Sequence, residues 1–351
     1  MRDSLASIRS TGGPSKRAAR GGGGTGLRRR TFLITLVLGS GGLLACSVSA
    51  AERTHPFRIG ALTESWGPTP PMVGLRDGLQ ELGYHENVHF VIGVRFTQGD
   101  IVGLPTAARE LVQHGVDVIF ASLEGPAKAA QMATDRIPIV FSGVGDPVGS
   151  GLVHSFARPG GNITGVTDLH LELGPKRLEV FLEMIPDLKR ILFPYDANDT
   201  HSVAAARVYQ DAAHRLKIEL VEKAIQTREE AQATLAQVRR GEVDGILATQ
   251  ILSLNIPGFV LEATAQRAIP TMFAGAFWVE QGGFASYGPD FYQSGWQAAR
   301  LVDKILKGVD PAEIPVEVNP KIELAINLQV AKTLGLTIAP EVLYQADRLV
   351  R

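Results

Sequence analysis

Cysteine is almost missing from this chain of 351 residues, and the single one, Cys46, lies near its start. A disulfide framework or a zinc site made of cysteine pairs is excluded, because each needs more than one cysteine. The sequence also has no P-loop and no G-x-S-x-G turn, and its glycine-rich stretch 143–151 does not give G-x-G-x-x-G. We therefore predict no catalytic residues and no cofactor.

The chain also lacks the excess of positive charge that nucleic-acid binding requires. Residues 51–351 hold 27 Lys and Arg against 35 Asp and Glu, which is a formal charge of −8. A surface of that sign repels phosphate backbones. We expect no nucleic-acid partner.

No apolar run is long enough for a transmembrane helix, which needs about 20 residues. Residues 1–50 instead combine a basic start with a short apolar run, which is typical of a signal peptide. Arg29 and Arg30 precede Thr-Phe-Leu, and this order favours twin-arginine export over an ordinary secretory leader. Cleavage after Ala50 is favoured, although residues 43–46 (LLAC) leave a lipid anchor at Cys46 open. We predict a periplasmic protein.

After the leader, strand-like and helix-like segments alternate, a pattern typical of parallel sheets with helices on both faces. The predicted strands are residues 57–62, 88–96, 116–121, 137–141, 162–167, 190–195, 218–221, 244–249, 271–273 and 283–287. Five predicted helices cover residues 104–114, 126–135, 176–185, 202–216 and 292–307. Two others begin near residues 72 and 228, and one more ends near residue 268. The pattern predicts an α/β protein.

Two such runs of elements predict two doubly wound parallel-sheet lobes joined by a multi-strand hinge. We place lobe 1 at residues 57–165 plus about 288–318, and lobe 2 at residues 166–287. The pattern does not assign residues 319–351 to either lobe.

Residues 85–89 (HENVH) match the H-E-x-x-H zinc motif, which requires a helix so that both histidines share one face. Gly83 precedes the motif and an alternating apolar pattern begins at Val88, so we predict a turn that enters a strand. In an extended chain the two histidines would lie about 13 Å apart, too far for one metal ion. We predict no metal site.

Four separated stretches carry a resemblance to a known family: residues 144–165, 282–291 (GGFASYGPDF), 303–317 and 326–338 (INLQVAKTLGLTI). They resemble, in the same order, the tryptophan/tyrosine-type group of ABC transporter substrate-binding proteins, which have the type I periplasmic binding protein fold. The resemblance implies a monomeric, exported protein that captures a small organic solute by hinge closure and delivers it to ABC permease subunits in the inner membrane. An amino acid is one option for the solute.

Ligands of open α/β sheets bind at the carboxyl ends of the strands. We therefore expect the small-molecule ligand to contact residues that follow strands or lie in the joining segments. These are Ser65, Trp66, Ser122, Glu124, Asp146, Tyr195, Asp196, Gln250 and Tyr287.

Individual roles differ within this set. Trp66 could stack on a planar ligand or pack against its own helix, and both interpretations stay open. Ser122 begins a helix whose N–H groups suit a carboxylate. Glu124 is favoured over Asp146 for an ammonium group, because Asp146 can bond its own backbone.

Two positions depart from the resemblance. Glu124 stands where the family tends to have Gly-Thr-Pro, a change that would either exclude an anion or recruit an ammonium group. Tyr195-Asp196 stands where the family tends to have Asn-Pro. We interpret Asp199 and His201 as solvated loop residues.

Two other functions are alternatives. A solute sensor that signals to a membrane receptor would have the same sequence features. An enzyme on this fold is less favoured: Glu64, Glu124 and Asp146 follow strands and could serve a glycosidase, but no other catalytic signal supports that reading.

Overall fold

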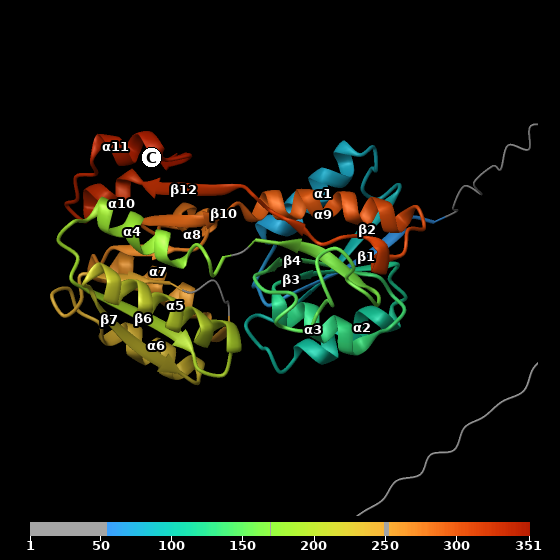
Figure 1. Ribbon diagram of the computed structural model, residues 1–351, viewed down its shortest axis with the longest axis horizontal. Helices are drawn as coiled ribbons and strands as arrows, with labels where there is room; N and C mark the ends of the chain where they lie inside the picture. Colours follow the sequence, from blue (N-terminus) through green and yellow to red (C-terminus); the bar gives the residue numbers. More distant parts are fainter. Residues whose placement is uncertain (1–54, 169, 249–252) are drawn as a thin grey trace, which may run out of the picture. The chain divides into compact units, whose positions relative to one another are not determined.

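Short apolar runs form the strands of two sheets, and amphipathic segments form the helices that cover them (Figure 1). The computed structural model describes residues 55–168, 170–248 and 253–351, and residues 53–351 belong to one compact unit. The predictions for the leader, Cys46 and Gln250 therefore lie outside the described residues.

The first sheet is parallel throughout, with the order β11-β5-β4-β3-β1-β2 in the part of the chain that the structure describes. Its central strands are fully buried because helices cover both faces. The strands are β1 (Phe57–Thr63), β2 (Phe90–Phe96), β3 (Val118–Ser122), β4 (Ile139–Val144), β5 (Ile163–Thr167) and β11 (Glu317–Val318).

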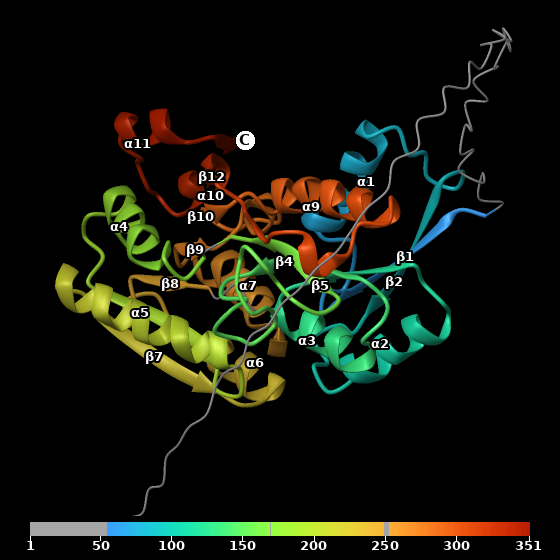
Figure 2. The same ribbon diagram turned by 45° about the vertical axis from the view of Figure 1, so that its right-hand side comes forward.

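Two pairs of helices cover this sheet, α1 (Pro70–Glu81) with α9 (Phe291–Leu306) and α2 (Leu104–Gln113) with α3 (Glu124–Ala133). Figure 2 shows the two pairs on opposite faces. Helices α1 and α9 touch backbone to backbone, because a Cβ on Gly74 would lie 2.0 Å from the carbonyl oxygen of Tyr292. A glycine is required there. Helix α9 thus brings a late part of the chain back to the first sheet.

The second sheet has the order β13-β12-β10-β9-β8-β6-β7 in the described residues, and only the β10–β12 pair is antiparallel. Its strands are β6 (Arg190–Asp196), β7 (Glu219–Ile225), β8 (Gly245–Leu247), β9 (Thr271–Phe273), β10 (Ala285–Pro289), β12 (Ile322–Asn327) and β13 (Arg348–Val350). The C-terminal segment, which the sequence pattern left unassigned, therefore pairs with the second sheet.

One core of the second sheet lies under α4, α5 and the C-terminal helices, and another lies under α6 and α7. The helices are α4 (Gly174–Met184), α5 (Thr200–Leu216), α6 (Arg228–Gln237), α7 (Ile256–Arg267), α8 (Ala276–Glu280), α10 (Leu328–Thr333) and α11 (Pro340–Gln345). Thr227 caps α6, because the Thr227 hydroxyl accepts the Glu230 N–H at 3.1 Å.

The chain passes between the sheets after β5, at Asp290 and between β11 and β12. Buried Asn319 connects these passages. Its N–H donates to the Thr167 carbonyl at 2.7 Å, and its Nδ2 donates to the Asp290 carbonyl at 2.8 Å. Asn319 therefore connects the three crossings through its backbone N–H and its side-chain amide.

The HENVH segment differs from the prediction. The strand begins at Phe90, not Val88, and Asn87 turns the chain with a φ of 64°. The turn brings the rings of His85 and His89 to 5.3 Å between centroids, where the His89 Nδ1 accepts the His85 N–H at 2.8 Å. The predicted separation of the two histidines was wrong. Within the described residues, no group of three or more His, Cys, Asp or Glu is placed to hold a metal ion.

Among the described helices, none combines the length and the apolar character needed to cross a membrane.

Candidate functional site

A cavity of about 370 Å³ lies at the carboxyl ends of β1, β3 and β4. Its lining combines the loop 65–71 after β1 and the tips of β3 and β4 with residues of α7, α8 and the start of α9. Elements that belong to both sheets therefore contribute to it. A cavity of this size is in the range that holds small organic ligands.

Four aromatic side chains line the cavity: Trp66, Phe277, Trp278 and Phe291. Trp278 is fixed by Phe273, on which it stacks with 5.8 Å between ring centroids, and Phe277 packs edge-on against it. Trp66 is 40% exposed, and the Arg228 guanidinium lies 5.6 Å from its ring centroid. The lining thus offers flat apolar surface on more than one side.

Buried hydroxyl groups line the same cavity. Ser122 and Ser142 are register partners on β3 and β4, and neither Oγ atom has a hydrogen-bond partner among the described residues. Ser65 is already engaged, because its Oγ donates to the Gly67 carbonyl at 2.6 Å. Ser122 and Ser142 therefore retain hydrogen-bonding capacity for a ligand.

Three carboxylates from the two sheets lie close to each other. Glu64 follows β1, Asp196 ends β6, and Asp199 caps α5 by accepting the Ser202 N–H at 2.6 Å. Burial, with the negative charges of Asp199 and Asp196, raises the pKa of Glu64 to about 7. The two neighbouring carboxylates and burial therefore oppose ionisation of Glu64, and a cation placed beside Glu64 would favour its charged form.

Glu124, the first residue of α3, forms ion pairs with His201 of α5 and with Lys128 one helical turn on. Burial on its own would raise the pKa of Glu124, but the two cations outweigh it and the net shift is downward. Burial likewise opposes a charge on His201, yet Glu124 leaves the pKa of His201 above its ordinary value. Glu124 is thus a charged, paired residue.

The interpretation of Asp199 and His201 as solvated loop residues was wrong. His201 is buried, in the first turn of α5, and Asp199 is the N-cap of that helix. The reason is that the helix begins at Thr200, earlier than the predicted start at Ser202.

Of the predicted residues that the structure describes, the others do not line the aromatic cavity: Glu124, Asp146, Tyr195, Asp196 and Tyr287. Asp146 is exposed and accepts the Gly149 N–H at 2.7 Å, so it bonds its own loop. Tyr195 is half-buried and stacks on Phe193, and the backbone carbonyl of Tyr287 accepts from Arg177. Ser65, Trp66 and Ser122 are the predicted residues that line this cavity.

Sequence reasoning missed Ser142, Phe291 and the aromatic residues of α8. A signal for α8 was available, because Gly275 to Trp278 follow β9 just as Trp66 follows β1. Nothing in the local sequence indicated that these two loops share one cavity.

Comparison with known proteins places these features in context. A family model described as ABC transporter substrate binding protein matches residues 69–350. A tyrosine-binding protein of Clostridioides difficile is 29% identical over 264 residues, which cover 75% of this chain and 76% of that protein.

Solved structures are similar over most of the chain. A conserved domain protein of Vibrio cholerae is 30% identical, with a TM-score of 0.74 over 85% of this chain and 100% of its own. An ABC domain of Streptococcus pneumoniae in complex with L-Trp is 25% identical, with a TM-score of 0.73 over 84% of this chain and 100% of its own. These matches confirm the predicted type I periplasmic binding protein fold and the family resemblance.

Proposed function

Because the chain belongs to the family of ABC transporter substrate-binding proteins, we propose that it is the extracytoplasmic solute-binding protein of an ABC importer and that its solute is an aromatic amino acid. The observation that carries the proposal is the cavity of about 370 Å³ whose lining includes Trp66, Phe277, Trp278 and Phe291. Aromatic walls favour a planar ring, because stacked rings bury much area at little entropic cost.

The ring of the solute lies among these aromatic side chains in our proposal. Its carboxylate accepts hydrogen bonds from the hydroxyls of Ser122 and Ser142, which have no other partner among the described residues. Charge-assisted hydrogen bonds of this kind are short and strong. The relatives that bind tyrosine and L-Trp support this class of ligand.

The ammonium group of the solute is held by carboxylates, with Glu64 as the principal partner. The raised pKa of Glu64 reflects burial beside Asp199 and Asp196, and a cation in that position would relieve both effects.

Capture proceeds by hinge closure, with the lobes divided near residues 165 and 288 and residues 319–351 joined to lobe 2 by strand pairing. A ligand that contacts both lobes stabilises the closed form, because it binds that form more tightly than the open one. Export through a signal peptide in residues 1–50 and delivery to permease subunits complete the proposal.

Titration calorimetry on the purified mature chain tests the proposal. Tryptophan, tyrosine and phenylalanine are compared with leucine, which lacks the ring, and with tryptamine, which lacks the carboxylate. We expect binding only of the aromatic amino acids. A ligand that binds should also stabilise the fold, because at 100 times its Kd it raises the free energy of unfolding by about 2.7 kcal/mol. Tight binding of a sugar or of leucine, with no response to aromatic amino acids, would refute the aromatic assignment.

A further inference from the structure

The side chain of Trp66 is held differently from the other two tryptophans. Trp278 stacks on a neighbouring ring, and Trp296 donates its indole N–H to a carboxylate at 2.7 Å. Within the described residues, neither an aromatic ring nor a hydrogen bond orients the Trp66 side chain. The neighbour that does so is the guanidinium of Arg228, whose carbon lies 5.6 Å from the centroid of the Trp66 ring.

Arg228 reaches Trp66 from the opposite lobe. Arg228 is the first residue of α6, which packs on the second sheet, whereas Trp66 follows β1 of the first sheet. The guanidinium carbon also lies 6.0 Å from the ring centroid of Phe259, a buried residue in the core of the second sheet. No described carboxylate forms an ion pair with Arg228. Its charge therefore contacts one aromatic ring of each lobe.

The position of Arg228 does not favour the helix that it begins. The N-terminal end of a helix favours negative charge, and the acidic residues Glu229 and Glu230 meet that preference. Thr227 and Glu230 already cap α6 through two hydrogen bonds with the backbone. A positive charge at this position adds nothing to the stability of α6, so the contact with Trp66 is what accounts for Arg228.

Trp66 lines the aromatic cavity and is 40% exposed, so its side chain lies where the cavity opens to solvent. Arg228 is not among the residues that line the cavity, and it therefore contacts Trp66 from outside. We propose that Arg228 and Trp66 form a latch over the cavity opening, in which Arg228 is a positioning residue that holds Trp66 over the bound solute and delays its release. This proposal rests on the proposed capture of a solute by hinge closure.

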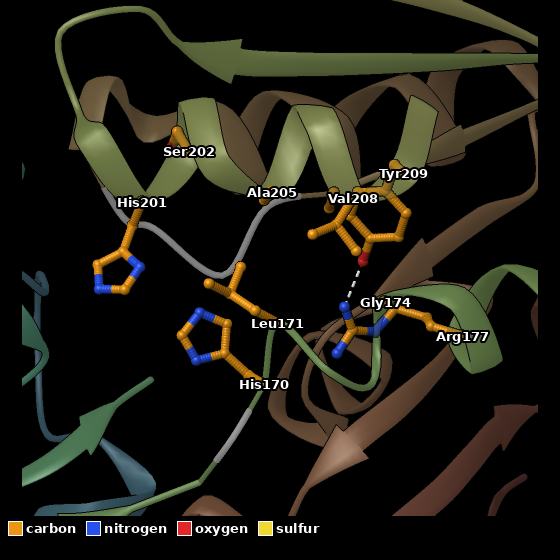
Figure 3. Close-up of a pocket in the computed structure, with 10 residues that line it drawn as sticks. His170, Leu171, Gly174, Arg177, His201, Ser202, Ala205, Val208 and Tyr209 are labelled. Atoms are coloured by element: carbon orange, nitrogen blue, oxygen red, sulfur yellow. Dashed lines mark hydrogen bonds between the residues drawn. The ribbon is translucent and has the colours of Figure 1, made fainter. Parts of the chain in front are cut away.

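The latch differs from the ion pair that also joins the two lobes. Figure 3 shows His201 extending from the first turn of α5 beside His170, and neither residue lines the aromatic cavity. The pair of His201 with Glu124 weakens when the imidazole loses its proton. Arginine stays charged and the indole of Trp66 does not titrate, so the latch persists at a pH at which the ion pair is weak.

Release of L-tryptophan, followed by stopped-flow fluorescence, tests the latch. Arg228→Gln should raise the dissociation rate constant about two- to fivefold, the effect of one exposed cation–π contact. The association rate constant should not change, because the latch forms after the solute has entered. Arg228→Lys keeps a cation that can lie over the ring and should restore most of the slow release. An unchanged dissociation rate constant in Arg228→Gln would overturn the latch.

Two further variants separate the latch from other roles of arginine. In Arg300→Gln the same type of contact is removed within α9, where Arg300 lies 5.7 Å from the Trp296 ring centroid, and solute release should stay as slow as in the unchanged chain. In the Trp66→Leu background, Arg228→Gln should have no further effect on release. An effect that persists without Trp66 would show that Arg228 binds the solute directly and would overturn the latch.

A measurement without solute separates the latch from the proposed ligand. The chain from Ala51 onward contains no cysteine, so Met132→Cys in α3 and Asp211→Cys in α5, both exposed positions, each accept one spin label. Double electron–electron resonance at pH 9, where the ion pair is weak, then compares the closed and open populations.

Arg228→Gln should lower the ratio of closed to open molecules about two- to fivefold, whereas Arg300→Gln should leave it unchanged. Distances that are the same with and without Arg228→Gln would overturn the latch. If L-tryptophan does not bind but the closed population falls as expected, the aromatic ligand is wrong and the latch stands.

Discussion

The imidazole of His201, in α5, forms an ion pair with the carboxylate of Glu124, the first residue of α3. These helices pack on different sheets, so the pair connects the two halves of the described chain. Because one partner is a histidine, the strength of the connection depends on pH.

The first prediction concerns that pH dependence. The pKa of His201 is raised above 6.5, so its contribution to stability is complete below that pH and is lost as the pH rises through the folded-state pKa. The pKa of Glu124 is lowered below 4.5, so its contribution is present above that pH and is lost as the pH falls further. A double-mutant cycle with His201→Gln and Glu124→Gln should therefore show a coupling free energy of about 0.5–3 kcal/mol near pH 5.5 and a smaller one at pH 9. A coupling energy that does not change over this range would show that the pair is not ionic.

The second prediction concerns Glu64. Its pKa is raised to about 7, so the folded state loses stability as the pH rises from about 4.5 to 7 and the carboxyl must ionise. Glu64→Gln should stabilise the solute-free protein at pH 8, by at most about 3 kcal/mol, and should change little at pH 4.5. Urea unfolding at the two pH values measures this, and an equal effect at both would contradict the raised pKa.

The third prediction tests the aromatic wall. Trp66→Leu should weaken binding of an aromatic amino acid about tenfold, because a stacked ring face is lost. Trp296→Leu is the control: Trp296 lies in α9 and donates to Glu81 at 2.7 Å, away from the cavity. Equal calorimetric affinities for the two variants would remove Trp66 from the proposed site.

The fourth prediction concerns the crossings between the sheets. Asn319→Ala removes the donor to the Asp290 carbonyl and to the Ser294 hydroxyl, both at 2.8 Å, and should cost about 1–3 kcal/mol of stability. Asn162→Ala is a matched control, because its Nδ2 donates to two carbonyls, of Thr134 and Ile137, within the first-sheet region. Both should destabilise the protein, but only Asn319→Ala should alter solute affinity. The same affinity in both variants would mean that the crossings do not govern closure.

The fifth prediction concerns export. Replacing Arg29 and Arg30 by Lys should leave precursor in the cytoplasm, because the twin-arginine route depends on this pair. Fractionation followed by immunoblotting measures the distribution. Normal export of the variant would support the ordinary secretory leader.

Periodicity in the sequence determined the order and type of most elements. Alternating or continuous apolar runs predicted the strands through Ala285–Pro289, and spacing of three and four predicted the longer helices, because burial on one face is a local pattern. The short helices α8, α10 and α11 were not predicted. Strand ends also indicated Ser65, Trp66 and Ser122 as lining residues, since parallel strands deliver their carboxyl ends to one edge.

Tertiary structure alone decided which distant residues meet. The His201–Glu124 pair, the carboxylates around Glu64 and the shared cavity of Trp66 and Trp278 each join segments that follow different strands. The pKa values and the binding properties of these groups arise from desolvation and from charges a few ångströms away, and such distances follow from packing, not from spacing along the chain.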